Sequence, residues 1–458
     1  MGKGKKMKDM TKGSPLKLIV TFAIPMILSG ILQQCYNLAD SLIAGRFAGV
    51  EALAAVGVST PITMLFVGLG TGIGMGVGVV ISQIFGAKRM KELKTSIYTA
   101  LITLLAVSLI LLTVGTLLTP TLLRWMNTPE NIFEDAKLYL SIYMLGLPFL
   151  FMYNIANSIF NALGDSKKPL YFLIFSTIFN ILLDLLFVAK FRWGVAGVAW
   201  ATFIAQGMAA CLAVFVLLRR TKKLEKKVPL YSFSLLGGMM KVGVPTMIQN
   251  AIVSIGNLFV SALVNSYGSD FIAGYSAALK INGFFTIVIV MIGNAVATFS
   301  GQNIGAGQYD RPVKGLKAGM MINFIYVSIA AICMFLFGRQ LVGLFVNEAA
   351  GEEVYAAGVG YLKIVVASSL LFIILNNCCA VCRAAGYAIS FTSTTLVDLI
   401  VRVGSAYLLT DVLGSASLYW SITLGWGVGA VMGAYFFLSG KWKNVKLLKE
   451  NQPESTSG

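Results

Sequence analysis

Histidine is absent from the 458-residue chain, and charged residues are scarce, at 12% of the total. Without histidine, the chain lacks the commonest metal ligand and the side chain that most often acts as a base near neutral pH. Soluble globular proteins carry about 25% charged residues, so the low charge content excludes an ordinary soluble domain. The six cysteines lie within or at the ends of apolar stretches and lack the spacing of a disulfide scaffold. This placement indicates small buried apolar residues and not a zinc or redox site.

Long apolar runs are what the chain has in excess. Hydrophobic residues make up 57% of it, and its mean hydropathy is +0.80. About 20 consecutive apolar residues can cross a bilayer as a helix, so the sequence predicts an all-α integral membrane protein. Twelve spans are expected, at about 16–44, 52–83, 96–120, 132–161, 168–190, 194–218, 234–265, 271–301, 316–338, 354–382, 387–410 and 415–439.

Basic residues are distributed unevenly along the chain. The net charge is +17, and with the N-terminus placed inside, 26 of the 36 Lys and Arg residues fall in inner segments and six in outer loops. Cytoplasmic loops carry an excess of Lys and Arg, so both termini are expected in the cytoplasm, with the protein in the inner membrane of a bacterium. The surplus is a topology signal with an attraction to anionic lipid, and no nucleic-acid partner is expected.

The two halves of the chain resemble each other. A fixed separation between matching residues along a whole membrane protein indicates two bundles with a site between them. The matched positions, 219 to 222 residues apart, are Pro25 and Pro245, Asn37 and Asn257, Gln83 and Gln302, Tyr139 and Tyr361, Asn154 and Asn376, Gly164 and Gly386, and Trp200 and Trp420.

Each repeat holds six spans, an even number, so both halves enter the membrane from the same side. The predicted fold is therefore two six-helix bundles, twelve transmembrane helices in all, related by a pseudo-twofold axis along the membrane normal. The polar tails are expected to be mobile. The predicted parts are a cytoplasmic N-terminal tail (1–15), an N-lobe (16–219), a cytoplasmic linker (220–233), a C-lobe (234–439) and a cytoplasmic C-terminal tail (440–458).

Pro25 and Pro245 occupy equivalent places in the first helix of each half. A proline removes one backbone hydrogen bond and kinks a helix, and the freed carbonyl needs a partner or a cavity in lipid. Two interpretations stay open at this stage: static kinks, or hinges for an alternating-access movement.

Buried carboxylates are the most informative polar residues. Of 19 acidic residues, only Asp40, Asp184 and Asp398 fall clearly inside spans. A charge at the bilayer centre costs about 2.5–3.5 kcal/mol on insertion scales, so such residues usually face a cavity and have a function. Asp40 and Asp184 both come late in outward-running spans, Asn180 lies one turn below Asp184, and Thr202 comes early in an inward-running span. These four residues are therefore expected at one level of one bundle.

Oxygen donors of this kind suit a hard monovalent cation or a proton, and Na⁺ at Asp40, Asn180, Asp184 and Thr202 is one possibility. Two carboxylates in a low dielectric cannot both stay ionised cheaply unless a cation compensates them. The alternative is a structural hydrogen-bond network. Asp398 lies four residues before Arg402, so it either forms an ion pair with it or faces a substrate.

Several of these residues together resemble the multidrug and toxic compound extrusion (MATE) family over residues 14–440. The resemblance rests on Pro25 and Pro245, on Gln83 and Gln302 with the Gly-Ala that follows each, on Gly164-Asp165, and on Asn180 with Asp184. The set of Asp40, Asn180, Asp184 and Thr202 is similar to the N-lobe ion site of the DinF-like branch. The same resemblance suggests Tyr139 and Asn157 beside that site. Acidic residues are missing from spans seven and ten, so coupling is placed in the N-lobe.

The resemblance implies a secondary active antiporter that exports amphipathic organic cations in exchange for inward Na⁺ or H⁺. It implies a monomer without an organic cofactor. A Met- and Phe-rich chain can line an adaptable cavity, although most such residues face lipid or neighbouring helices. The candidate cavity residues are Met26, Gln34, Met64, Met152, Met247, Gln249, Asn282, Met291 and Asp398.

Other functions fit the sequence less well. A lipid-linked oligosaccharide flippase of the same superfamily is the main alternative, and it would need a basic cavity, whereas Lys280, Lys363 and Arg402 are scattered over three spans. A major-facilitator carrier usually has an acidic and Arg-rich motif in the loop where this chain reads Gly-Ala-Lys-Arg at 86–89. A channel would need a continuous ring of pore residues. An enzyme is not expected, because no nucleophile has a convincing base partner.

Overall fold

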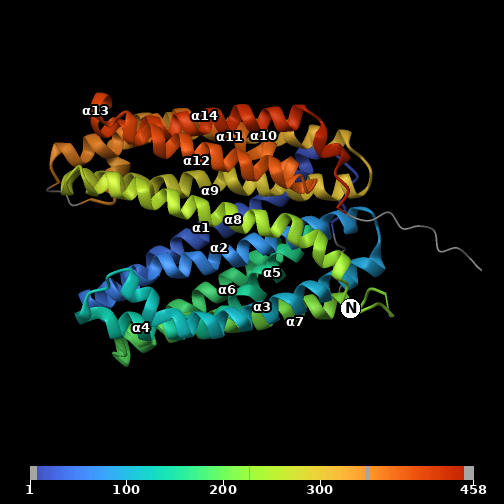
Figure 1. The fold of residues 1–458 in the computed structure, drawn as a ribbon, viewed down its shortest axis with the longest axis horizontal. Helices are drawn as coiled ribbons and strands as arrows, with labels where there is room; N and C mark the ends of the chain where they lie inside the picture. The colour runs from blue at the N-terminus through green and yellow to red at the C-terminus, as the bar shows by residue number, and fades with distance from the viewer. Residues whose placement is uncertain (1–7, 226, 347–349, 448–458) are drawn as a thin grey trace, which may run out of the picture.

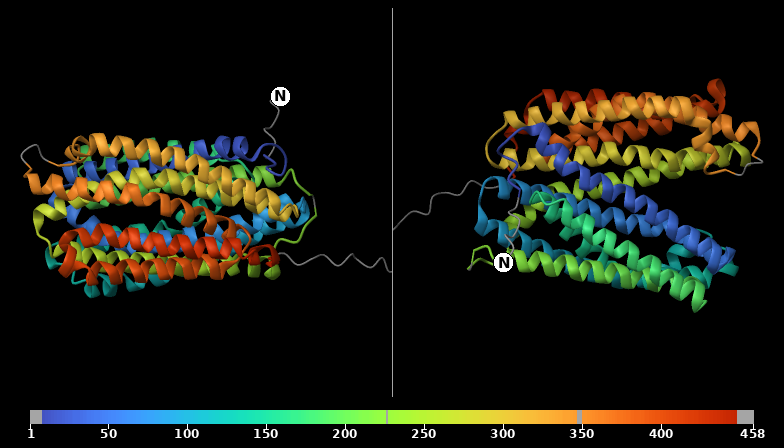
Figure 2. Two further views of the ribbon diagram at one scale, coloured as in Figure 1. Left: turned by 90° about the horizontal axis from the view of Figure 1, so that it is seen from above. Right: turned by 180° about the vertical axis from the view of Figure 1, so that it is seen from behind.

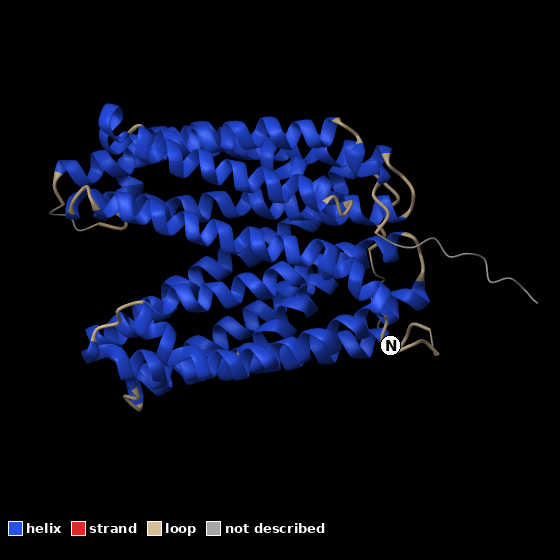
Figure 3. Cartoon of the chain, viewed as in Figure 1, coloured by secondary structure: helices blue, strands red, loops and turns tan. Residues whose placement is uncertain are grey.

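The computed structural model describes residues 8–225, 227–346 and 350–447, and within these ranges the chain is helix and loop without strands (Figure 3). The helices of the first half are α1 (Pro15–Ile43), α2 (Val50–Gly86), α3 (Met90–Trp125), α4 (Glu130–Leu145), α5 (Leu147–Ala162), α6 (Lys167–Asp184) and α7 (Gly194–Thr221). Those of the second half are α8 (Phe233–Asn265), α9 (Ser269–Gly305), α10 (Asp310–Gly343), α11 (Glu352–Ala384), α12 (Ala388–Leu408), α13 (Thr410–Leu413) and α14 (Ser417–Leu438).

Ten helices of the described residues are long and apolar enough to cross a membrane, and the bent pair α4 and α5 would make an eleventh. The pair meets at Gly146 with a bend of 48°, and Pro148 follows in the first turn of α5, where a missing N–H costs nothing. The predicted span at 132–161 is thus a broken helix. With α12, which packs between α8 and α14, about twelve elements cross the membrane, and the predicted all-helical membrane fold is confirmed.

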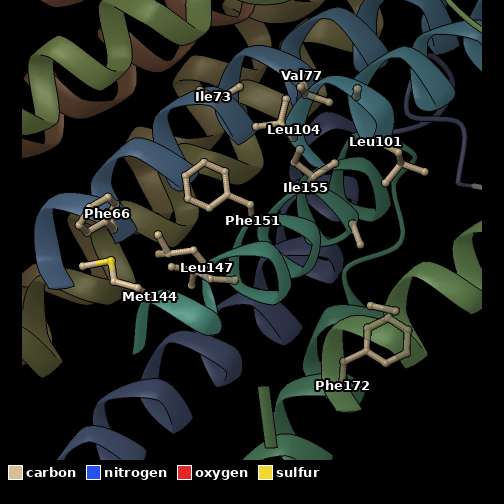
Figure 4. Packing of buried hydrophobic residues seen from close by; sticks show 14 of the residues in the cluster. Phe66, Ile73, Val77, Leu101, Leu104, Met144, Leu147, Phe151, Ile155 and Phe172 are labelled. Carbon is tan, nitrogen blue, oxygen red and sulfur yellow. The ribbon is translucent and has the colours of Figure 1, made fainter. Parts of the chain in front are cut away.

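The helices form two bundles that lie against each other at one end and diverge toward the other (Figure 1). The end where the bundles meet carries the described ends of the chain and the 222–232 connection, and is called the terminal end here; the opposite end is the far end. Each bundle has its own buried apolar cluster. In the first bundle, side chains such as Leu104, Phe151 and Ile155 interlock between α3 and α5 (Figure 4).

The first helix of each half contacts both bundles. α1 packs on α9 and α10 of the second bundle and on α6 of the first, and it crosses between them in the rear view (Figure 2). Gly30 makes this crossing possible, because a Cβ there would lie 2.6 Å from Ile287 of α9. α8 does the reverse and packs on α2 and α12. The pseudo-symmetry of the sequence therefore appears in space as an exchange of first helices.

The terminal end is joined by a reciprocal pair of hydrogen bonds between the bundles. Gln83 of α2 donates to the carbonyl of Ala384 over 2.7 Å, and its repeat partner Gln302 of α9 donates to the carbonyl of Ala162 over 2.9 Å. Gly86 and Gly305 let the two helices approach, since a Cβ on either would overlap the backbone of the opposite glutamine. The repeated Gln-x-x-Gly motif therefore forms the contact between the bundles.

Both chain tails dock on this end, contrary to the expectation that they are mobile. Residues 8–13 form a strap in which Met10 is fully buried and its N–H donates to Gln302 Oε1 over 2.9 Å. Its carbonyl accepts from Arg311 over 3.1 Å. Near the other end, Trp442 is buried against Phe437. The residues 1–7 and 448–458 of the predicted tails lie outside the described residues.

Asp9 organises the strap by accepting hydrogen bonds from the N–H and hydroxyl of Thr11, at 2.8 and 2.5 Å. Burial alone would raise the pKa of Asp9. The Thr11 hydrogen bonds, with the positive charges of Lys88 and Lys12, outweigh burial and hold that pKa below its usual value. Asp9 is therefore ionised at neutral pH.

Candidate functional site

Three helix segments bring the predicted polar residues together in the half of the first bundle near the far end. Asp40 lies in the last turn of α1, Asp184 ends α6, and Thr202 lies in the second or third turn of α7. α6 packs on both α1 and α7. At Asp184 the α-helix gives way to the wider π-helical segment η2 (Leu185–Lys190), a distortion often found at functional sites. The predicted common level of these residues is thus realised by packing.

The two carboxyl groups lie within hydrogen-bonding range of each other. Asp184 is 1% exposed, whereas Asp40 is half-buried. With its amide nitrogen turned to the carboxylate, Asn180 donates to Asp184 Oδ2 over 2.8 Å and accepts from the Thr202 N–H over 3.3 Å. The contact from Thr202 to Asn180 is therefore made by its backbone, and its hydroxyl is left for another partner.

That partner is Tyr36, a residue that the sequence analysis missed. The side chains of Tyr36 and Thr202 are hydrogen-bonded, and Tyr36 lies close enough to Asp40 and Asp184 to feel both charges. Tyr139 lies close to the same two carboxylates. The signal for Tyr36 was available in the spacing, because it precedes Asp40 by four residues and so shares its helix face.

Asn157, the other residue suggested beside the network, pairs with Tyr153 one turn away on α5. Its carbonyl oxygen is buried without a partner among the described residues. The geometry brings Tyr139 to the carboxylates and leaves Asn157 in a neighbouring pair.

The electrostatics of the network call for a positive charge. No ion pair to Asp40 or Asp184 occurs within the described residues, and each carboxylate keeps one buried oxygen without a hydrogen-bond partner. Two ionised carboxylates at this range repel strongly in a low dielectric, so a shared proton or a bound cation must offset one charge. The donor set of carboxylate, amide and hydroxyl oxygens fits Na⁺ as well as H⁺. A small cavity lined by Tyr139, Thr202 and Gln206 adjoins it.

The candidate cavity residues lie in different surroundings, and only some of them lie between the bundles. Gln34, Met247 and Met291 lie where the two bundles meet, next to Gly283, Gly72 and Gly30 respectively. Met26 is buried in an apolar cluster on the second-bundle side, which gives it a packing role in this arrangement. Met64 is 55% exposed and Met152 is partly buried within the first bundle.

The polar candidates of the second bundle are bound to neighbouring side chains. Gln249 donates to Thr395 Oγ1 over 2.6 Å, and Asn282 donates to the Tyr361 hydroxyl over 3.2 Å. Asp398 forms the predicted pair with Arg402 at 3.5 Å. The geometry therefore supports the ion-pair alternative for Asp398.

The two prolines lie inside unbroken helices. α1 runs through Pro25 and α8 through Pro245. The Ser29 hydroxyl donates to the carbonyl of Pro25 over 2.9 Å, whereas the carbonyl that loses its helical donor to the proline is that of Thr21, four residues earlier. Their role as hinges stays a prediction.

Known proteins resemble the chain over nearly its whole length. The family model MatE matches residues 25–186 and 245–408, which are the two halves of the repeat. "Probable multidrug resistance protein YpnP" of Bacillus subtilis (strain 168) is 30% identical over 97% of this chain and 100% of that protein. "Probable multidrug resistance protein YoeA" of the same strain is 33% identical over 82% of both chains. A solved outward-facing multidrug resistance MATE family transporter covers 98% of this chain and 100% of its own, with a TM-score of 0.87 and 22% identity.

Proposed function

Because the chain belongs to the MatE family of multidrug efflux transporters, which are not enzymes, we propose that it is a secondary active antiporter that exports amphipathic organic cations in exchange for inward Na⁺ or H⁺. The observation that carries the coupling part is the pair of carboxyl groups at Asp40 and Asp184. They lie in hydrogen-bonding range of each other, and no basic residue among those that the structure describes forms an ion pair with either. We further place the chain in the DinF-like branch, on the strength of Asn180 and Thr202 beside this pair.

The proposed orientation puts the terminal end in the cytoplasm of a bacterial cell and the far end outside. The excess of Lys and Arg in the segments of the terminal end supports it. In this orientation the diverging bundles of Figure 1 represent the outward-facing state. The reciprocal Gln83 and Gln302 bonds then form the closed cytoplasmic gate.

The proposed cycle uses the ion to release the cargo. An ion entering from outside offsets the charge of Asp40 and Asp184, which removes the repulsion between α1 and α6. α1 then shifts, with Pro25 as its bend point, and the organic cation loses its affinity for the space between the bundles. The bundles rock about the contact region, the far end closes and the cytoplasmic end opens. Gln34, Met247 and Met291 are placed at the junction of the bundles to contact the cargo.

The test is transport by the purified protein, as a monomer, in liposomes. Efflux of a fluorescent organic cation is followed under a Na⁺ gradient alone and under a pH gradient alone. One gradient should drive efflux in the wild type, and Asp184→Asn should reduce that drive by about tenfold or more, the scale of a typical coupling free energy. Glu134→Gln is the matched control, because Glu134 is an exposed carboxylate paired only with Lys137 at 3.1 Å.

Two results would contradict the proposal. Ion-driven efflux that is as fast in Asp184→Asn as in Glu134→Gln would remove the coupling site. Efflux that neither gradient drives in the wild type would remove the antiport itself.

A further inference from the structure

The second bundle contains a counterpart of the ion network, because the repeat is preserved in space. Tyr139 and Tyr361 are separated by 222 residues, and each is buried in its bundle. The same separation, which holds up to Gly164 and Gly386, puts Asn180 opposite Arg402 and Asp184 opposite Ala406. The separation of 220 found at Trp200 and Trp420 puts them opposite Ile400 and Gly404. In the first helix, where the separation is 220, Asp40 corresponds to Val260. In either register the counterpart lacks both carboxylates, and the corresponding helix carries the guanidinium of Arg402.

Arg402 occupies the same surroundings that the ion network has in the first bundle. It lies close to Tyr361 and Tyr275, as the network lies close to Tyr139. Tyr361 is held by the Asn282 amide over 3.2 Å and stacks edge-on against Tyr275 and Tyr419. The tyrosine neighbours are thus retained while the charge beside them is changed.

A carboxylate, that of Asp398, lies beside Arg402 and comes from one turn earlier on the same helix. Its Oδ2 lies 3.5 Å from Arg402 Nη2, and its side chain is 8% exposed. α14 covers the other oxygen, since a Cβ on Gly425 would lie 2.5 Å from Asp398 Oδ1. That oxygen has no hydrogen-bond partner within the described residues. The carboxylate is reachable mainly from the side that the guanidinium occupies.

We propose that Arg402 is a tethered cation that permanently takes the place of a coupling ion in the second bundle, so that only the Asp40 and Asp184 site exchanges ions. The inference rests on the proposed antiport. The formal charges support it: in the described part of the chain neither Asp40 nor Asp184 forms an ion pair with a basic residue, whereas Asp398 is paired with Arg402. A mobile cation that approaches Asp398 would meet the fixed positive charge of Arg402, which already compensates the carboxylate. Arg402 thereby determines how many ions take part in one cycle.

The test measures whether Asp398 can take up a proton or cation. Dicyclohexylcarbodiimide, an apolar reagent that modifies protonated carboxyl groups, is reacted with the purified full-length protein, and the modified residues are identified by mass spectrometry. In the wild type Asp398 should stay at background. In Arg402→Met its labelling should rise several-fold, and in Arg402→Lys, which keeps a positive charge, it should stay at background. Gel filtration and thermal unfolding establish that each variant is folded.

A second measurement does not depend on the folding of Arg402→Met. The double variant Asp398→Asn with Arg402→Met removes both charges of the pair. If no coupling ion binds at Asp398, the ion-driven efflux of this variant should stay within about twofold of wild type. Labelling of Asp398 in the wild type, or a folded Arg402→Met that stays unlabelled, would overturn the inference. So would loss of ion coupling in the folded double variant. Failure of the antiport itself is distinguishable, because it shows as wild-type efflux that neither gradient drives, whereas the labelling of Asp398 is measured without transport.

Discussion

The two ends of the molecule differ in whether their polar contacts join the two bundles or stay within one. At the terminal end, glycines bring α2 and α9 into backbone contact and the two bundles exchange hydrogen bonds. At the far end the bundles separate, and the strongest polar contacts stay within one bundle, such as the bidentate pair of Arg339 with Glu352. The closed end therefore depends on a few polar contacts that are individually weak, each contributing about 0.5–1.5 kcal/mol. An interface of that kind can be opened and remade in every transport cycle.

A buried native thiol can report on the closed end. Cys382, near the end of α11, is 1% exposed and lies in the same apolar cluster as Met10. In a background with the other five cysteines replaced, its rate of reaction with a maleimide measures how often the terminal end opens. The following predictions use that rate.

The largest effect is expected from Gly86→Ala. A Cβ at Gly86 would overlap the backbone of Gln302, and backbone atoms cannot move aside as a flexible side chain can. The terminal end should then be unable to close. Cys382 should react rapidly, and efflux should be lost. Gly57→Ala, on the same helix with open space around it, is the matched control. Slow labelling of Gly86→Ala would show that the backbones are not in contact.

Removing the two glutamines one at a time tests whether the reciprocal contacts are equal. Gln302→Ala removes a bond to Ala162 and leaves the Met10 N–H without its acceptor, whereas Gln83→Ala removes only the bond to Ala384. A buried group left unsatisfied costs about 1–3 kcal/mol, so Gln302→Ala should speed Cys382 labelling about tenfold and Gln83→Ala by less. Equal rates in the two variants would mean that the strap adds nothing to the closed end.

The smallest effect is expected from Asp9→Asn, because both hydrogen bonds of Asp9 stay within the strap and it acts on Lys88 and Arg311 through charge alone. Its pKa is lower in the folded protein than in the unfolded chain, so its stabilisation is present at neutral pH and is lost as the pH falls below about 4. The labelling rate should rise by about twofold in Asp9→Asn at neutral pH, the size of a single exposed polar contact. A substitution at the far end, Glu352→Gln, should leave the rate unchanged. A larger change in Glu352→Gln than in Asp9→Asn would contradict the division between the two ends.

Much of the fold could be predicted because a bilayer imposes a simple rule on composition. The span positions followed from apolar length, and the bundle arrangement followed from matched pairs such as Tyr139 and Tyr361. The bend at Gly146 lies two residues before Pro148, and a proline inside an apolar run predicts an interrupted helix. Its angle of 48° depends on packing that the sequence does not show. The carboxylate pair was predictable because charge is rare inside a membrane. Tyr36 was missed because aromatic residues are common there.

The docking of the tails and the candidate cavity could not be read in the same way. Met10 and Trp442 stand among charged residues, so local composition indicates a solvated tail although each is buried. The cavity candidates depend on how each helix is rotated about its axis. Helices that are apolar all round carry no periodic signal of that rotation, and so Met26 and Met64 could not be distinguished.

The exchange of first helices between the bundles has a consequence for the folding of the chain. A single half expressed alone would present an open slot where the first helix of the other half belongs, and its own first helix would lack half of its partners. Two such halves could complete each other only by mutual insertion, in the manner of a domain-swapped dimer. Each half therefore depends on the first helix of the other for its completion, and the two halves are expected to fold as one unit.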